Sequence, residues 1–256
     1  MANDWQRDEL LLALRLYCST AFGKLHKTNP DIIHLANVIG RTPSAVAMKA
    51  CNFASLDPSI PQKGMSKTSS ADRALWNEFM ENSTDIADQA EALYESRVLT
   101  PDSSTPNNQF KEFKIPTGET ETIREIKTRR VQSFFRRSVL QSYNHRCAVS
   151  GLAVPQLLIA SHITPWAENE NQRANPSNGI ALNALYDKAF DRHLISFDEN
   201  FALVISQKLK QQSKDKVIRD YFLDYEGKIL EMPHRFYPDV EALKKHRLRM
   251  MEIADG

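Results

Sequence analysis

The chain has 256 residues, of which 41% are hydrophobic and 25% charged, and its formal net charge is +1, a composition typical of a globular protein with a sizeable core. The three cysteines, Cys18, Cys51 and Cys147, are odd in number and far apart, which argues against a disulfide framework or a cysteine zinc knuckle. No apolar run approaches the roughly 18 residues of a membrane helix, and acidic residues stand where a signal peptide would be basic, so we expect a soluble, cytoplasmic protein.

The N-terminal part of the chain is predicted to be helical. Asp4 is a candidate N-cap for an amphipathic helix over residues 4–22, and residues 69–95 predict further helix with an acidic face. The apolar positions of the first helix have helical spacing: Leu10, Leu11, Leu14, Tyr17 and Cys18.

Residues 29–56 predict two helices joined by a short turn. Gly40 ends the first helix, Thr42 is the N-cap of the second, and Pro43 occupies its first position. This order resembles the reading unit of helix-turn-helix DNA-binding domains.

The helix-turn-helix interpretation places Arg41, Ser44 and Lys49 near DNA. Residues 1–98 contain 10 Lys and Arg against 12 Asp and Glu, however, and this negative balance favours the alternative of a plain helical hairpin. In that case residues 1–98 are expected to bind a regulatory partner or signal instead of DNA.

Residues 99–121 separate two parts of different character. The segment collects three prolines with Ser, Thr, Asn and Gly and has no apolar period, so it is the predicted linker. The expected domains are therefore a helical domain over residues 1–98 and a second domain over residues 122–256.

The second part of the chain is basic. Residues 122–256 contain 21 Lys and Arg against 16 Asp and Glu, and residues 124–146 alone contain seven basic residues and one Glu. Such a run suits a polyanion whose phosphates are neutralised by Lys and Arg, although a solvated helix face has the same composition.

Short strands and helices are expected in this second part. In chain order they are a basic helix over 129–143, a tight turn over 144–152, a strand ending at His162, a polar loop, a helix over 179–190 and a strand over 193–198. Polar residues that converge from a strand tip and a helix face form a compact cradle for one hard cation.

The segments "CAVSG", "ASHITPW" and "RANPSNGIALNALYDKAFDRHLISF", in this order, resemble HNH endonucleases, the ββα-metal nuclease class, and particularly a branch of predicted bacterial restriction endonucleases. The resemblance covers about residues 125–206. It implies an α+β fold, in which a helical N-terminal domain is followed by a ββα-metal nuclease domain. The implied activity is hydrolysis of phosphodiester bonds in DNA, in restriction or anti-phage defence.

The resemblance also implies roles for two residues. His162 corresponds to the general base, which takes a proton from the attacking water, and a neutral imidazole suits this task at physiological pH. Asn178 corresponds to the central asparagine, whose amide binds backbone and holds the base-bearing loop against the helix. Its implied role is orientation.

The residues at the metal-binding positions depart from the family pattern. Asp187 stands nine residues after Asn178, where the family usually has a metal-binding histidine, and Asp191 follows one turn later on the same helix face. Ser161 is a poor ligand at a position that is often Asp, and His193 is a further candidate. The choice among Asp187, Asp191 and His193 stays open, with Asp187 first, and carboxylate oxygens favour one Mg²⁺ or Mn²⁺ ion per site.

Three arginines are candidates for clamping the flanking phosphates, because a guanidinium group matches phosphate geometry: Arg136, Arg137 and Arg173. Double-stranded DNA is the expected substrate, and a homodimer would place one active site on each strand. Two alternatives remain open: a nuclease effector controlled through residues 1–98, and a catalytically decayed DNA-binding protein.

Overall fold

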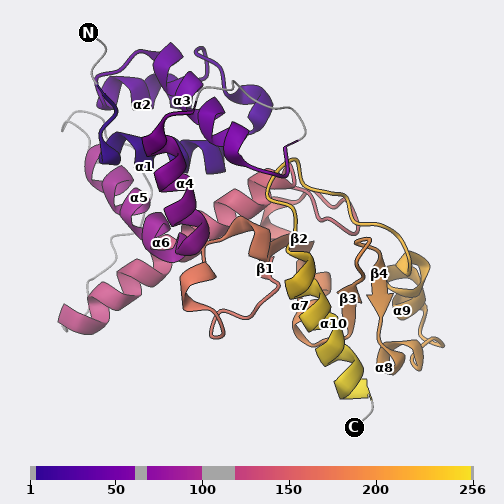
Figure 1. Cartoon of the computed structure of the whole chain (residues 1–256). Coiled ribbons are helices and arrows are strands. Elements are labelled where there is room, and N and C mark those ends of the chain that lie inside the picture. Colours follow the sequence, from indigo (N-terminus) through magenta and orange to yellow (C-terminus); the bar gives the residue numbers. More distant parts are fainter. Residues whose placement is uncertain (1–3, 61–67, 100–118, 255–256) are drawn as a thin grey trace. The chain divides into compact units, whose positions relative to one another are not determined.

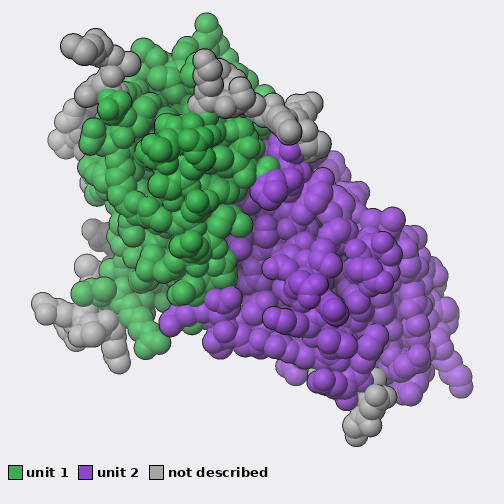
Figure 2. Space-filling model, viewed as in Figure 1, with its two compact units in different colours: residues 1–57, 61–134, 171–174 green, residues 58–60, 135–170, 175–256 purple. Residues whose placement is uncertain are grey.

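The computed structural model describes residues 4–60, 68–99 and 119–254 (Figure 1). The chain forms two compact units, coloured separately in Figure 2. Unit 1 comprises residues 1–57, 61–134 and 171–174, and unit 2 comprises residues 58–60, 135–170 and 175–256. None of the described helices combines the length and the apolar character needed to cross a membrane.

The described residues of unit 1 are mainly α-helical. Its elements are α1 (Arg7–Ser19), a 3-10 helix (Phe22–Lys24), α2 (Pro30–Val38), α3 (Pro43–Leu56), α4 (Ser70–Glu81), α5 (Ser83–Arg97) and the first part of α6 (Glu119–Ser142). A core between α1, α2 and α3 is formed by Leu12, Leu16, Ile32, Leu35, Ala36, Val46 and Ala47. The predicted apolar face of the first helix, including Leu10, Leu14 and Cys18, is buried as expected.

The predicted N-cap of α1 is wrong. The cap is Gln6, whose backbone N–H donates to the Glu9 carboxylate at 2.8 Å. Asp4 lies two residues too early for this role, and its backbone carbonyl instead accepts a hydrogen bond from Arg41 at 2.8 Å.

The predicted order of a helix, a short turn and a second helix over residues 29–56 is confirmed. Gly40 adopts a φ of 66°, which glycine tolerates without a steric penalty, and so ends the first helix. The hydroxyl of Thr42 accepts from the backbone N–H of Ala45 at 3.2 Å, and Pro43 opens α3.

Most of the predicted linker, residues 100–118, lies outside the described residues. The compact units divide the chain at another place, within the continuous helix α6, because residues 119–134 group with unit 1. The neighbours Phe134 and Phe135 accordingly belong to different units.

The described part of unit 2 is α+β. Its elements are the end of α6, β1 (Leu158–His162), β2 (Gly179–Asn183), α7 (Ala184–Asp191), β3 (Ile195–Phe197), β4 (Leu203–Ile205), α8 (Gln207–Lys210), α9 (Lys216–Tyr221) and α10 (Val240–Ala254). Short 3-10 helices span Pro155–Leu157, Glu170–Gln172, Pro176–Asn178 and Leu223–Tyr225. The core includes Phe135, Val139, Leu158, Ile180, Leu182, Tyr186, Phe190, Ile195, Phe197 and Leu203.

The prediction of one helix over residues 179–190 is wrong in its first half. Residues 179–183 form β2, which pairs antiparallel with β1, and all five are buried. The helix begins only after Asn183, whose side chain accepts from the backbone N–H groups of Leu185 and Tyr186 at 3.0 Å each. Pairing with β1 satisfies the backbone of this apolar run, and the Asn183 cap then starts α7.

A second hairpin and α10 complete unit 2. The predicted strand over 193–198 is confirmed as β3, which pairs antiparallel with β4, and α10 packs against β3. Cys18 and Cys147 are buried free thiols, and Cys51 is a partly buried one.

Candidate active site

The hairpin of β1 and β2 carries His162 at its open end. His162 is the last residue of β1, and its partner in the antiparallel register is Gly179, the first residue of β2. The backbone N–H of Ile163 donates to the carbonyl of Asn178 at 2.9 Å and extends this pairing by one step. The base candidate therefore stands on backbone that is fixed on both sides.

The imidazole of His162 contacts two aromatic side chains. The ring of Phe135, from α6, is stacked on it with a centroid distance of 3.7 Å and an interplanar angle of 13°. The ring of Trp166 meets it at 90°, with a centroid distance of 5.6 Å. Both contacts restrict the orientation of the imidazole.

Asn178 holds the segment that follows His162. Its Oδ1 accepts from the backbone N–H of Thr164 at 2.8 Å, and its Nδ2 donates to the carbonyl of Thr164 at 3.2 Å. The side chain is nearly buried, with 7% exposure. Asn178 lies at the end of the 3-10 turn before β2, so its side chain joins this turn to the segment that follows β1.

Asp187 and Asp191 lie on α7, one helical turn apart. Burial raises the pKa of the Asp187 carboxyl; Ser161 opposes this shift, and the nearby charge of Asp191 adds to it. The Ser161 hydroxyl oxygen is itself buried, and its approach to Asp187 lacks the geometry of a normal hydrogen bond. A polar cluster that includes the unsatisfied hydroxyl oxygen of Ser161 thus lies where β1 meets α7.

The side chain of His193 packs against α10. It follows α7 with a φ of 52°, and its ring packs against the ring of His246 from α10 at a centroid distance of 4.4 Å. Burial lowers the pKa of His193, and the charge of Arg249 lowers it further. Among the described residues, no three His, Cys, Asp or Glu side chains gather to hold a metal ion, so Asp187, Asp191 and His193 do not form one three-ligand site.

The donor atoms nevertheless fit one class of ion. Mg²⁺ retains several water ligands and takes only one or two protein carboxylates together with substrate phosphates. Asp187 and Asp191 supply two hard oxygen donors, and the buried Ser161 hydroxyl next to them still has hydrogen-bonding capacity for a bound water. This set fits Mg²⁺ or Mn²⁺ and is unsuited to a closed zinc site, which needs about four protein ligands.

Two of the three predicted phosphate-binding arginines lie on α6 beside Phe135. Arg136 is exposed, and its guanidinium donates to the carbonyl of Pro155 at 3.4 Å. Arg137 is partly buried. Arg173 belongs to the segment assigned to unit 1, where its backbone N–H donates to the hydroxyl of Thr84 at 3.2 Å.

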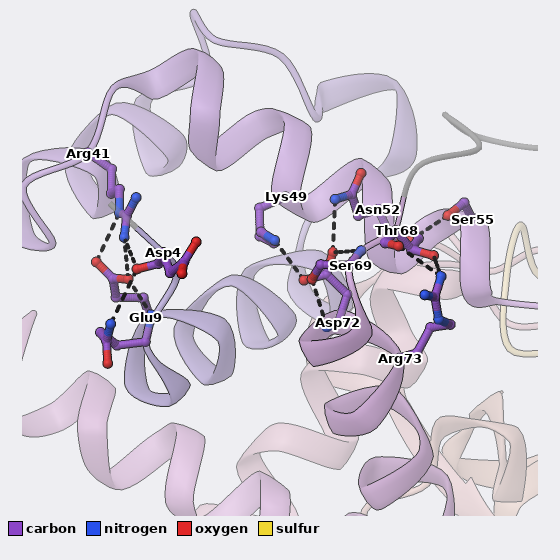
Figure 3. A network of polar contacts seen from close by, with 11 residues as sticks. Asp4, Glu9, Arg41, Lys49, Asn52, Ser55, Thr68, Ser69, Asp72 and Arg73 are labelled. Atoms are coloured by element: carbon purple, nitrogen blue, oxygen red, sulfur yellow. Dashed lines mark hydrogen bonds and ion pairs between the residues drawn. The ribbon is translucent and has the colours of Figure 1, made fainter. Parts of the chain in front are cut away.

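The two basic residues predicted to contact DNA from the helix-turn-helix segment are engaged inside unit 1 (Figure 3). Arg41 pairs with Glu9 at 2.8 Å, and 14% of each side chain is exposed. The ammonium group of Lys49 lies 2.6 Å from Asp72, and Lys49 is 6% exposed. Lys49 shares the inner face of α3 with Val46 and Phe53, so the predicted DNA contact is not available to its charge in this structure.

The sequence predictions did not include Phe135 or Gly179 among the site residues. The available signal was Gly179 itself, because a glycine within a buried strand often marks the close approach of another side chain. Here a Cβ at Gly179 would lie 2.7 Å from Cζ of Phe135 and 2.4 Å from Cγ2 of Val139. The missing side chain therefore makes the room that brings α6 up to the hairpin.

Comparison with known proteins gives one finding that bears on this site. Residues 147–198 match a family described as HNH endonuclease. The matched segment contains β1, β2, α7 and β3, and with them His162, Asn178, Asp187 and Asp191. A comparison with curated proteins found no match.

Proposed function

We propose that the protein is a divalent-metal-dependent endonuclease that hydrolyses phosphodiester bonds in double-stranded DNA. The proposal starts from the match of residues 147–198 to a family described as HNH endonuclease. The observation that carries the proposal is the fixed position of His162. This residue ends a paired strand, and its ring contacts the rings of Phe135 and Trp166. A free-standing surface histidine would have none of these supports.

In this proposal His162 is the general base. A ring nitrogen of the neutral imidazole accepts a proton from a water molecule, and the resulting hydroxide forms a bond to phosphorus while the bond between phosphorus and the leaving oxygen breaks. Asn178 positions the adjoining segment through its two hydrogen bonds to Thr164 and takes no part in proton transfer.

Asp187 and Asp191 would hold the metal ion through their carboxylate oxygens. When bound, Mg²⁺ or Mn²⁺ would neutralise negative charge on the phosphate and on the leaving oxygen. The pKa of Asp187 is raised mainly by burial and further by the charge of Asp191, and a bound cation would stabilise both carboxylates in their charged form.

Basic residues of α6 are the proposed contacts with DNA phosphates. Arg136 is exposed one position after Phe135, and a single hydrogen bond to the Pro155 carbonyl leaves guanidinium donors for a phosphate. Arg137 and Arg173 remain proposed contacts because a guanidinium group matches the geometry of a phosphate. A homodimer, a cytoplasmic location and a role in restriction or anti-phage defence complete the proposal.

A second candidate function concerns residues 1–98. The engagement of Arg41 with Glu9 and of Lys49 with Asp72 favours a helical region that receives a protein partner or signal over one that binds DNA. A substitution at Ser44, which is exposed in the first turn of α3, distinguishes DNA binding from partner binding. If α3 contacts DNA, Ser44→Asp weakens duplex binding through charge repulsion; if it serves a partner, affinity for DNA is unchanged in a binding assay at low salt.

The nuclease proposal is tested by incubating supercoiled plasmid with the full chain and Mg²⁺ or Mn²⁺. We expect nicking or linearisation that EDTA abolishes and that His162→Ala reduces by about 100-fold or more, since this is the scale of general-base catalysis. His34→Ala, a change at an exposed histidine on α2, is the matched control and should cleave like the wild type. Equal survival of supercoiled plasmid with wild type and His162→Ala, across metals and concentrations, would refute the proposal.

A further inference from the structure

The aromatic side chains around His162 come from two separate elements. Phe135 lies on α6 and is 2% exposed, whereas Trp166 lies four residues beyond His162, in the segment that Asn178 fixes through Thr164. A stacked ring at a centroid distance of 3.7 Å blocks rotation of the imidazole about its Cβ–Cγ bond towards that side. The ring of Trp166 makes a second contact with the imidazole, at 90° to its plane.

The backbone is adapted to this stacking. Gly179 faces His162 in the strand register, and any larger residue there would place its Cβ 2.7 Å from the ring of Phe135. The close approach of α6 therefore depends on glycine at the position that pairs with the base candidate. Core packing alone would not require the ring of Phe135 to be nearly parallel to the imidazole, at an angle of 13°.

We propose that Phe135 and Trp166 are positioning residues, which hold the imidazole of His162 in the orientation that presents a ring nitrogen to the attacking water. The inference rests on the proposed nuclease function. It extends the site to α6, which lies outside the matched segment 147–198. Neither ring exchanges protons; both act through His162.

Phe135→Leu is the decisive variant, because leucine keeps an apolar side chain in the core but removes the stacked ring. We expect kcat to fall by roughly 10- to 100-fold, since a misplacement of about 1 Å has an effect of this size, while KM changes little. Phe134→Leu is the matched control on the same helix: Phe134 is 1% exposed and contacts Phe79 in unit 1 at a centroid distance of 5.9 Å. It carries the same loss of an aromatic ring without contact to His162, so it should retain the kcat of the wild type.

Trp166 is tested in the same way. Trp166→Phe keeps an aromatic edge towards the imidazole and should retain most of kcat, whereas Trp166→Leu should lower it. Rescue by the aromatic variant separates positioning from simple filling of space. Equal rates for the two variants would remove Trp166 from the inference.

An NMR readout does not depend on activity. The stacked ring of Phe135 shifts the imidazole carbon-bound proton resonances of His162 through its ring current, so Phe135→Leu should move them towards ordinary values and Phe134→Leu should leave them in place. Unchanged His162 resonances in Phe135→Leu, or a kcat equal to the wild type, would overturn the inference. A wild-type chain that does not cut plasmid would instead refute the proposed function, and the two failures are therefore distinguishable.

Discussion

The imidazole of His246 has both nitrogens engaged inside unit 2. Its Nε2 lies 3.1 Å from the carbonyl oxygen of Phe190, which can only accept, so Nε2 carries the proton. Its Nδ1 lies 3.0 Å from the hydroxyl of Ser196 and accepts from it. Stacking on the ring of Phe190 at 3.8 Å completes the surroundings of a neutral, buried ring.

This environment predicts a loss of stability in mild acid. Burial, with the neighbouring His193 and Arg249 in support, lowers the pKa of His246 to about 3 from its ordinary 6.5. The unfolded chain therefore binds this proton more readily, and the stabilisation is complete above pH 6.5 and declines as the pH falls towards 3. The free energy of unfolding in urea should fall by up to about 1.4 kcal/mol per pH unit below pH 6.5.

The contribution of His246 to the pH dependence of stability can be separated from that of the carboxyl groups. The carboxyl pKa values of Glu9, Asp72 and Glu78 are lowered by their basic partners, so these groups reduce stability only below about pH 4.5. Between pH 6.5 and 5, His246→Asn should flatten the slope, and His34→Asn, at an exposed position, should preserve it. Identical slopes in all three proteins would contradict the assignment.

At the scale of elements, the contact of α6 with the β1–β2 hairpin depends on one missing side chain. Val139 and Phe135 both approach the Cα of Gly179, and they belong to the same buried cluster as Leu158 and Ile180. Protein cores have little free volume, so an added methyl group at Gly179 must displace the helix or the strand.

Gly179→Ala is accordingly expected to destabilise unit 2 by about 1–3 kcal/mol, because the new Cβ would overlap with Val139 and Phe135. Gly23→Ala is a suitable control, since a Cβ there meets nothing within 4 Å. The free energy of unfolding in urea gives the comparison. If both variants are as stable as the wild type, the close packing of α6 against the hairpin is not as described.

Elements with local signals could be predicted from the sequence, and the element that needed a distant partner could not. Gly40 marks the end of α2, and Thr42 and Pro43 mark the start of α3. The apolar run of residues 179–183 fits a buried strand or a buried helix equally well. Only its pairing with β1, which lies on the other side of a long loop, decides for a strand.

The same distinction holds for the site. The spacing of His162, Asn178 and Asp187 identified the local segment, whose match to HNH endonucleases covers residues 147–198. The sequence does not predict the contact between Phe135 and His162, because the two residues are 27 positions apart. The helix that carries Phe135 is basic, and this composition indicates only a contact with phosphates. Lys49 was assigned to DNA because charged residues are usually exposed, whereas Asp72, 23 residues later, compensates its burial.

At the scale of the whole molecule, the compact units do not follow the predicted division at residues 99–121. In unit 1, Lys127 pairs with Asp85 at 2.7 Å, and Phe134 is buried in contact with Phe79. Residues 171–174, from the loop between β1 and β2, also belong to unit 1. There, Gln172 donates to the carbonyls at the end of α4, and the Ser83 hydroxyl donates to the carbonyl of Asn171 at 3.1 Å.

A fragment of residues 122–256 should therefore be less stable than the full chain, because it exposes Phe134 and removes the partners of residues 171–174. Limited trypsin digestion tests this directly. Cleavage after Arg173 is expected to be faster in the fragment, while cleavage after Arg219, which is exposed on α9, serves as the internal control. Equal protection of Arg173 in both proteins would show that its segment is ordered without unit 1.

Because Phe135 stacks on His162, residues 147–198 alone do not contain every side chain that surrounds the imidazole, and this matters when the segment is transferred to another protein. A cassette of residues 147–198 inserted into another host would carry His162 and Asn178 but leave behind the ring of Phe135, which α6 supplies. A host scaffold would have to offer an aromatic side chain over the imidazole and leave room for it opposite Gly179. The transferable unit is therefore the segment together with the last two turns of the helix that precedes it.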